Sequence, residues 1–342
     1  MTWHGFDEII DVRSPAEYAE DRIPGAVNLP VLSDIEHAEI GKLYKTSPFA
    51  ARLRGAGLLA SNISAHLQND YSSRPPEWRP LVYCRRGGQR SGAVVEILQR
   101  IGWKAQSLKG GYKQYRQEVI TNTQKLAPAI QWTVVGGKTG AGKTELLRVL
   151  RDAGESVIDL EALGNHRGSA FGGNGAQPSQ RLFESHLFAE LSQLPRNRPV
   201  FVEAEGRKIG KLHVPQPVLS AMRCAPLFYL RAALSARARR IVDDYSAMKD
   251  PKTFDAAIET IGKYAGAERR EKWRQQHADG QWETLASDLL ESFYDIGYQK
   301  SLSANYTPPA ARFSVNPNCQ KDMQKIAREI ARAADGGGTI RI

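Results

Sequence analysis

Two short segments of this 342-residue chain combine the residue types and the spacing of anion-binding loops. The first, Cys-Arg-Arg-Gly-Gly-Gln-Arg-Ser at residues 84–91, places a sulfur nucleophile among cations and glycines. The second, Gly-Lys-Thr-Gly-Ala-Gly-Lys-Thr at residues 137–144, has the composition of a loop that binds a diphosphate. The presence of both in one chain predicts chemistry in which a reactive sulfur or selenium atom meets a phosphorylated substrate.

Cys84 is the predicted catalytic residue of the first loop. Backbone N–H groups, the start of the following helix and the neighbouring cations would all stabilise a thiolate, so the sulfur should be nucleophilic near neutral pH. The alternative is a buried, inert cysteine at a strand end, but such a cysteine needs no electropositive surroundings. We expect the anion to be held by Arg85, Arg86, Gly87, Gly88, Arg90 and Ser91.

The second loop lies between a predicted strand at 131–135 and a predicted amphipathic helix at 145–151, which is the context of a Walker A motif. In this motif Lys143 should reach the terminal phosphate, and Thr144 can hold a magnesium ion. The motif does not specify ATP as the ligand. The residues predicted to bind the diphosphate are Gly137, Lys138, Gly140, Gly142, Lys143 and Thr144.

Carboxylates end or follow two further predicted strands, at 156–159 and 199–203. Asp159, Glu203 and Glu205 are therefore candidates for positioning Mg²⁺ or water, as a Walker B acid does, and the alternative is a surface carboxylate that closes a strand. Between these strands, the glycine-rich segment 164–173 contains His166 and Arg167. We expect both to contact phosphate or the reacting base, although glycine clusters also mark plain mobile loops.

The net charge of +10 and the pI near 9.5 favour a polyanionic partner, of which nucleic acid is the commonest. No apolar run approaches the roughly 20 residues that span a bilayer, and the first residues lack a secretory signal. We therefore expect a cytoplasmic protein without a membrane partner. Besides Cys84, the chain has only Cys224 and Cys319, which is too few for a disulfide framework and fits no zinc site. These two cysteines are expected to be structural.

Basic residues are dense in the last third of the chain. They can neutralise an RNA backbone while the aromatic rings of Tyr264 and Trp273 stack on unpaired bases. A solvated helix face is the alternative, because acidic residues such as Asp243 and Glu271 are interleaved. The candidate contacts to RNA are Arg231, Arg237, Arg239, Arg240, Arg270 and Arg274.

The elements expected before residue 120 alternate between strand and helix. Strands are predicted at 9–13 and 81–83, a turn and strand at 23–30, a helix at 91–100, and a last strand and turn at 106–112. Ser14 should cap a helix that begins at Pro15. Such alternation predicts an α/β fold with a parallel sheet and helices on both faces. A linker is expected at about 121–128, and the region from about residue 230 is predicted to be mostly helical.

Residues 4–120 closely resemble a rhodanese domain. The matching motifs are Asp-Val-Arg at 11–13 with Glu-Tyr at 17–18, Ile-Pro-Gly-Ala at 23–26 with Asn-Leu-Pro at 28–30, the cysteine loop, and Gly-Gly-Tyr at 110–112. Five residues separate Cys84 from Arg90, whereas the common sulfurtransferase loop has four. This is the Cys-x5-Arg length of phosphatases, which suits a tetrahedral oxyanion better than a compact persulfide. Tyr83 stands where tyrosine phosphatases have His, which argues against a phosphatase.

The order of the motifs extends the resemblance to nearly the whole chain. A rhodanese-like domain followed by a Walker A domain with Gly-Asn-His-Arg-Gly-Ser-Ala-Phe-Gly at 164–172 is similar to bacterial tRNA 2-selenouridine synthases. This resemblance implies three parts: a rhodanese-like domain at 1–124, a P-loop NTPase-like α/β domain at 125–230, and a helical, basic region at 231–342. It also implies tRNA with 2-thiouridine at the wobble position as substrate, and selenophosphate synthetase as a candidate partner.

The activity that the resemblance implies has two steps. Geranyl diphosphate first geranylates the thiouridine sulfur, and selenium from selenophosphate then replaces that sulfur. The P-loop would hold geranyl diphosphate, with Mg²⁺ as a candidate cofactor and no bound redox cofactor expected. Cys84 would either carry selenium as a selenenyl sulfide or belong to a loop that only binds selenophosphate.

Two other functions fit individual motifs. A P-loop kinase or ATPase with a rhodanese module that senses or supplies sulfur would leave the basic C-terminal region unexplained. An RNA-binding protein whose rhodanese domain has become a scaffold would have an unreactive Cys84 thiol.

Overall fold

The computed structural model describes residues 5–166, 175–244, 249–261 and 265–336. The chain divides into two compact units, and each is described by itself. The first comprises Met1–Thr123 and Pro178–Ser192, and the second comprises Gln124–Gln177 and Gln193–Ile342. None of the helices in the described ranges is long and apolar enough to cross a membrane. Arg167 and Tyr264, named above from the sequence, lie outside the described residues.

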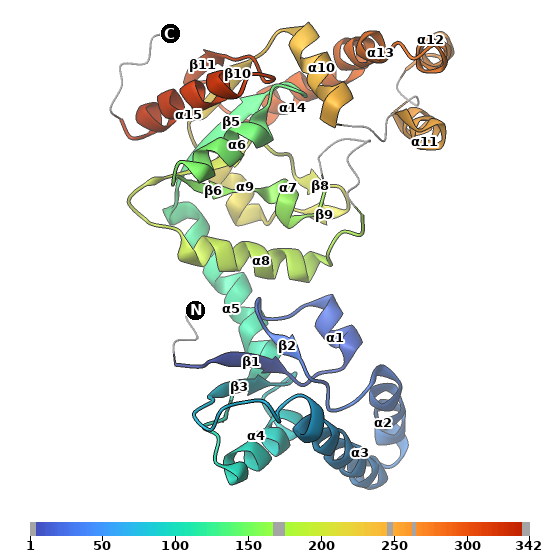
Figure 1. Ribbon diagram of the computed structural model, residues 1–342, viewed down its shortest axis with the longest axis vertical. Helices are drawn as coiled ribbons and strands as arrows, with labels where there is room; N and C mark the ends of the chain where they lie inside the picture. Colours follow the sequence, from blue (N-terminus) through green and yellow to red (C-terminus); the bar gives the residue numbers. More distant parts are fainter. Residues whose placement is uncertain (1–4, 167–174, 245–248, 262–264, 337–342) are drawn as a thin grey trace. The chain divides into compact units, whose positions relative to one another are not determined.

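The first unit contains a four-stranded parallel sheet in the order β2-β1-β3-β4. Figure 1 shows α3 and α4 on one side of this sheet and α1 and α5 on the other, which confirms the rhodanese-like architecture. Its elements are β1 (Glu8–Asp11), α1 (Pro15–Glu20), β2 (Val27–Asn28), α2 (Asp34–Thr46), α3 (Pro48–Asn69), β3 (Pro80–Tyr83), α4 (Gln89–Ile101), β4 (Gln106–Ser107), α5 (Gly111–Leu126) and α8 (Gln180–Gln193).

Local sequence explains several boundaries in this unit. Ser14 caps α1 as predicted: its hydroxyl accepts the Glu17 N–H, and the Glu17 carboxylate accepts the Ser14 N–H, which forms a capping box. The predicted linker at 121–128 contains a boundary between the two units, which falls between Thr123 and Gln124. It is mostly helical, because α5 continues to Leu126 and a 3₁₀ turn follows at Ala127–Ala129. Tyr115, Val119 and Thr123 are spaced by four residues and buried, so this helix has a continuous inner face.

The second unit contains a five-stranded parallel sheet in the order β11-β10-β5-β7-β6. Its strands are β5 (Gln131–Gly137), β6 (Ser156–Ile158), β7 (Pro199–Glu203), β10 (Leu227–Arg231) and β11 (Ala311–Ser314), with a hairpin of β8 (Lys208–Ile209) and β9 (Leu212–His213). Its helices are α6 (Lys143–Asp152), α7 (Leu160–Leu163), α9 (Gln216–Arg223), α10 (Leu234–Asp244), α11 (Pro251–Ile261), α12 (Ala267–Ala278), α13 (Trp282–Leu289), α14 (Asp295–Asn305) and α15 (Gln320–Ala334).

Helices α6 and α15 cover one face of this sheet. Leu146 and Leu150 of α6 and Ile326 and Ile330 of α15 form one buried cluster with strand residues such as Phe228. The region after residue 230 is mostly helical, as predicted, and α10, α11, α12 and α13 share a second cluster around the fully buried Trp273. That region nevertheless returns to the P-loop sheet, because β11 pairs with β10 and α15 packs against α6.

Candidate functional site

Cys84 follows β3 at the carboxyl edge of the first sheet. The chain passes from β1 to β2 on one side and from β3 to β4 on the other, so the strand order reverses between β1 and β3. In open parallel sheets, ligands bind at such reversals, beyond the carboxyl ends of the strands. The fold therefore delivers the predicted nucleophile to the position at which this architecture usually binds its ligand.

The sulfur of Cys84 is buried but well supplied with hydrogen-bond donors. The Ser91 hydroxyl donates to Sγ at 3.3 Å, and the Ser107 hydroxyl lies 3.0 Å from the Ser91 hydroxyl. Burial raises the pKa of Cys84, but the hydrogen bond from the Ser91 hydroxyl and those from the backbone N–H groups of Ser91, Arg86 and Gly88 outweigh it. The net effect is a pKa below the ordinary value of a thiol, which favours the nucleophilic thiolate.

Glycines at two positions fix the shape of this loop. Gly87 and Gly111 have φ of 65° and 56°, in the left-handed region that side chains disfavour. A Cβ on Gly111 would lie 2.3 Å from the carbonyl oxygen of Cys84 and 2.4 Å from the nitrogen of Gly87. The start of α5 also closes the loop, because the Tyr112 N–H donates to the Cys84 carbonyl at 2.9 Å. Backbone of α5 thus packs directly against the cysteine loop, which leaves no room for a side chain at this contact.

The three arginines of this loop differ in their surroundings. Arg85 and Arg86 are exposed and have no ion pair within the described part of the chain. Arg90 is held at the start of α4, where its Nη1 contacts the Glu17 carboxylate at 2.8 Å. Arg85 and Arg86 are therefore available to an incoming anion, whereas Arg90 is already paired.

The Asp-Val-Arg motif at residues 11–13 forms a buried ion pair close to the cysteine loop. The Asp11 carboxylate accepts three hydrogen bonds from Nε and Nη2 of the Arg13 guanidinium, and the Arg13 Nη2 also donates to the Asp21 carbonyl at 2.6 Å. The guanidinium lies 4.1 Å from the ring centre of Tyr112. Asp11 and Arg13 are both almost completely buried, so the role of this motif is to hold the structure around the cysteine loop together.

The second loop joins β5 to α6, in the strand, loop and helix order predicted. Gly142, with φ of 83°, is the N-cap of α6, and its left-handed backbone turns the chain into the helix. A cavity of about 210 Å³ opens at this helix N-terminus. Gly140, Gly142, Lys143 and Thr144 line it, together with Glu203, Glu205 and residues of α10 and α14.

Lys143 and Thr144 both face the end of β7. Lys143 Nζ lies 3.9 Å from Glu203 Oε2, and the Thr144 hydroxyl donates to Glu203 Oε1 at 2.7 Å. Burial lowers the pKa of Lys143, but the charges of Glu203, Tyr298 and nearby carboxylates raise it above its ordinary value. The lysine is thus a fixed positive charge at the entrance to a helix, as phosphate binding requires.

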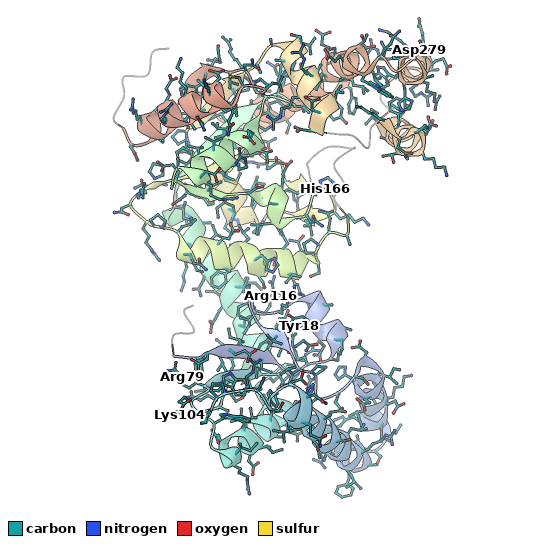
Figure 2. The ribbon with its side chains drawn as sticks, viewed as in Figure 1. Tyr18, Arg79, Lys104, Arg116, His166 and Asp279 are labelled. Carbon is teal, nitrogen blue, oxygen red and sulfur yellow. The ribbon has the colours of Figure 1, made fainter. Side chains whose placement is uncertain are left out.

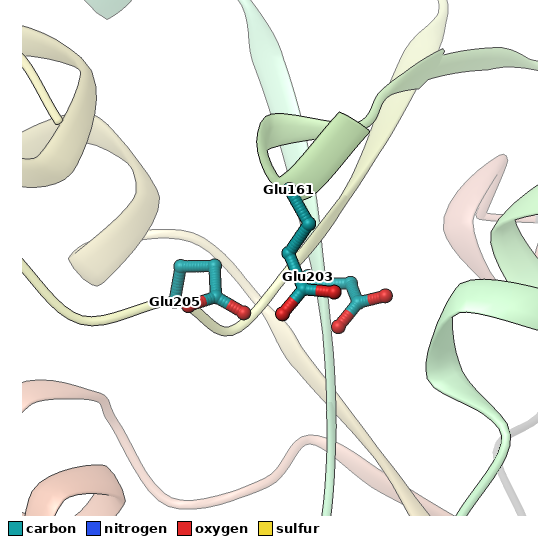
Figure 3. Close-up of side chains that lie close together, drawn as sticks. All are labelled: Glu161, Glu203 and Glu205. Carbon is teal, nitrogen blue, oxygen red and sulfur yellow. The ribbon is translucent and has the colours of Figure 1, made fainter. Parts of the chain in front are cut away.

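Three carboxylates converge beside the P-loop lysine. Glu161 of α7, Glu203 of β7 and Glu205 of the following loop have carboxylate oxygens within 4.8 Å of one another (Figure 3). Burial raises the pKa of Glu203, whereas Lys143 and Thr144 lower it. Burial and the charges of Glu161 and Glu203 raise the pKa of Glu205 well above its ordinary value. A divalent cation would relieve this repulsion, because Mg²⁺ prefers oxygen ligands.

Two residues that were predicted to bind the diphosphate, Gly137 and Lys138, instead contact side chains of α14. The Gly137 N–H donates to the Tyr298 hydroxyl at 2.8 Å. Lys138 Nζ pairs with Asp295 Oδ2 at 3.0 Å and lines a larger, separate cavity. Asp295 starts α14, directly after a π-helical turn at Leu290–Tyr294. The P-loop is thus fastened to α14 at two successive residues.

The other carboxylate and the histidine predicted from the sequence lie outside the smaller cavity. Asp159 caps α7, where Oδ1 accepts the Ala162 N–H at 2.9 Å. His166 lies beside the β8–β9 hairpin (Figure 2), and its Nδ1 has no hydrogen-bond partner in the ranges that the structure describes. Their roles in substrate contact stay predictions, as does that of Arg167.

The arginines predicted to contact RNA fall into three groups: one is buried, four form ion pairs with acidic residues, and one is exposed without an ion pair among the described residues. Arg237 is only 3% exposed, because it forms two hydrogen bonds of 2.8 Å with Asp295 and another with the Thr139 carbonyl. Its inclusion among surface contacts is wrong, since it supports the P-loop from within. Arg239, Arg240, Arg270 and Arg274 pair with acidic residues. Arg231 is exposed and has no ion pair among the described residues.

Sequence patterns gave no indication of several residues that shape these sites. Glu161, Asp295 and Tyr298 stand in ordinary helical sequence, and only the fold brings them to the P-loop. Ser107 could have been found only from the neighbouring strand register, because β3 pairs with β4 and places Val82 opposite Ser107.

These observations define the class of the protein: a rhodanese-like unit with a cysteine loop, joined in one chain to a P-loop unit in which a lysine lies beside a cluster of carboxylates. Residues 2–118 match the family described as Rhodanese-like domain, and residues 130–276 match the tRNA 2-selenouridine synthase AAA domain. A tRNA 2-selenouridine synthase from a Sulfurovum species is 31% identical over 347 residues, which cover 92% of this chain and 92% of that protein. The chain belongs to the tRNA 2-selenouridine synthase family.

Two further relatives have the same printed name. The protein from Nitrosomonas europaea is 37% identical over 245 residues, which cover 69% of this chain and 63% of that protein. The protein from Cupriavidus necator is 38% identical over 244 residues, with 69% and 65% covered. The matched region therefore spans less than two thirds of these two relatives.

Proposed function

We propose that this chain is a transferase that modifies the wobble uridine of tRNA in two steps. It first geranylates the sulfur of 2-thiouridine with geranyl diphosphate, and it then replaces the geranylated sulfur by selenium from selenophosphate. Family membership supports the tRNA product, and the presence of two anion sites of different chemistry supports two half-reactions. The cytoplasmic location and the participation of a selenophosphate synthetase stay predictions from the sequence.

The P-loop is assigned to the first step. The thiouridine sulfur attacks the allylic carbon, the bond from that carbon to the diphosphate oxygen breaks, and diphosphate leaves. Positive potential at the P-loop comes from Lys143, Thr144 and the N-terminus of α6. It stabilises the negative charge that develops on the departing diphosphate, and this stabilisation of the transition state accelerates the reaction.

A magnesium ion fits this site by the chemistry of its donors. Thr144, Glu161, Glu203 and Glu205 offer oxygen ligands on one side of the loop. When bound, the ion would neutralise charge on the diphosphate. Lys143 remains the residue that contacts the terminal phosphate in either case.

The Cys84 loop is assigned to the second step. Alkylation makes the sulfur a better leaving group. The selenium of selenophosphate attacks C2 of the base, the bond from C2 to sulfur breaks, and geranyl thiol leaves. Water then cleaves the selenium–phosphorus bond, which releases phosphate and leaves selenium on C2.

The lowered pKa of Cys84 supports an anionic, nucleophilic sulfur in this loop. Selenium in selenophosphate is at the selenide level, so a selenenyl sulfide on Cys84 would need a two-electron oxidant. Exposed Arg85 and Arg86 instead support a loop that binds selenophosphate without a covalent intermediate.

The two assignments are separated by single substitutions. Cys84→Ser should leave geranylation largely intact and abolish selenation, with exposed Cys224→Ser as the matched control. Lys143→Ala should lower geranylation by roughly 100-fold while still selenating tRNA that was geranylated beforehand, with exposed Lys321→Ala as control. Loss of geranylation alone in Cys84→Ser, or normal geranylation in Lys143→Ala, would overturn the assignment of the sites.

A further inference from the structure

A second cavity in the described part of the second unit lies on β10, β11 and α14 rather than at the P-loop. Its volume is about 1020 Å³, roughly five times that of the P-loop cavity. This is at the upper end of the range of roughly 300–1,000 Å³ that is common for ligand sites. Leu302 and Tyr306 line both cavities, so a ligand in the larger one would lie next to the diphosphate site.

The floor of this cavity is the sheet face opposite α15. Phe228 and Leu230 of β10 are buried in the cluster with α15. Side chains alternate along a strand, so Tyr229 and Arg231 share the other face. In the parallel register, Tyr229 is opposite Arg312 and Arg231 is opposite Ser314, and all four line the cavity. An aromatic ring and two guanidinium groups are therefore grouped on one face.

The charges on this face differ from those elsewhere in the basic region. Arg231 and Arg312 are exposed, and neither has an ion pair within the residues that the structure describes. In contrast, the nearby Arg240 pairs with Asp244 at 2.9 Å. The acidic residue at the rim, Asp322, already accepts the Asn316 N–H at 2.6 Å. The two arginines are thus available to an anionic partner.

We infer that this cavity is the entry site for unpaired nucleotides of the RNA substrate. Arg231 and Arg312 contact phosphates, and a base packs on the ring of Tyr229. Tyr306, whose hydroxyl donates to the Glu205 carbonyl at 2.7 Å, forms the wall towards the P-loop. An isoprenoid chain would fill the apolar part but would leave both guanidinium groups without a partner. This inference rests on the proposed function, because it takes RNA as the substrate.

The test is direct binding of a fluorescent anticodon stem–loop RNA that carries 2-thiouridine at the wobble position. The double variant Arg231→Ala/Arg312→Ala is compared with Arg151→Ala/Arg332→Ala, which removes two exposed arginines from α6 and α15. The first variant should bind at least tenfold more weakly, and its slope of log affinity against log salt should be shallower by about 1.4. The control should keep the wild-type slope.

A second variant separates the two occupants that the cavity could hold. Tyr229→Leu keeps apolar volume but removes the ring, and it should weaken RNA binding by roughly tenfold with an unchanged KM for geranyl diphosphate. Normal RNA affinity with a raised KM for geranyl diphosphate would assign the cavity to the isoprenoid and overturn the inference.

The outcomes also distinguish this inference from the proposed function. If the wild-type protein modifies the RNA but the arginine double variant binds it normally, or no worse than the control variant, only the inference fails. If the wild-type protein neither binds nor modifies the RNA, the proposed function fails as well.

Discussion

The hydroxyl of Ser91, in the first turn of α4, donates a hydrogen bond to the sulfur of Cys84 at 3.3 Å, across the loop that leads into this helix. Ser107 of β4 in turn lies within hydrogen-bond distance of Ser91. The sulfur of Cys84 therefore accepts a hydrogen bond from the Ser91 side chain, which Ser107 contacts in turn, as well as hydrogen bonds from the loop backbone. This relationship explains how a buried thiol can have a lowered pKa.

The first prediction concerns the pH dependence of Cys84. A lowered pKa means that thiolate is present at lower pH than in an ordinary cysteine, so Ser91→Ala should raise the pKa and move the alkylation profile to higher pH. The rate of reaction with iodoacetamide is measured from pH 5 to 10, and Ser107→Ala should cause a smaller displacement. An unchanged profile for Ser91→Ala would show that the hydroxyl does not stabilise the thiolate.

The second prediction concerns the shape of the same loop. Gly111→Ala places a Cβ 2.3 Å from the Cys84 carbonyl, so it should destabilise the first unit by about 2 kcal/mol or more and slow alkylation of Cys84. Gly92→Ala is the matched control, because nothing lies within 4 Å of its Cβ position in α4. It should be neutral or stabilising by about 0.5–1 kcal/mol in urea unfolding. Equal stabilities of the two variants would contradict the packing described.

The third prediction concerns the buried pair beneath the P-loop. Asp295→Ala leaves Arg237 buried without its partner, which should cost roughly 3–5 kcal/mol of stability in the second unit. Asp152→Ala breaks an exposed pair with Arg148 on α6 and should cost less than about 1 kcal/mol. Urea unfolding followed by far-UV circular dichroism compares them. A small effect of Asp295→Ala would mean that water or another group reaches Arg237.

The fourth prediction concerns the carboxylate cluster. If Glu203 helps to hold magnesium, Glu203→Gln should raise the magnesium concentration needed for half-maximal geranylation by roughly 10-fold or more, since it removes a charged ligand. Glu155 is half-buried, pairs with Arg198 at 3.6 Å and lies outside the cavity, so Glu155→Gln should have no such effect. Geranylation that is insensitive to chelator in the wild-type protein would exclude this role for the cluster.

The helix cap, the cysteine loop and the P-loop could be predicted from the sequence, because each depends on residues that are close together along the chain. Ser14, Cys84 and Gly142 each occupy the position that their neighbours in the sequence imply. The strands β10 and β11 could not be predicted in the same way, because β11 is only four residues long and follows helical sequence. The burial of Arg237 depends on Asp295, 58 residues away, and no local pattern records such a pairing.

The most direct test of the account reads the modified nucleoside after each step. The protein is incubated with 2-thiouridine-containing tRNA and geranyl diphosphate, selenophosphate is added, and the digested nucleosides are analysed by mass spectrometry at both stages. The account predicts a geranyl adduct first and a product with selenium in place of sulfur second. Active tRNA and fresh donors that give neither mass change would contradict it, and turnover of a nucleotide by the P-loop would then be the next activity to measure.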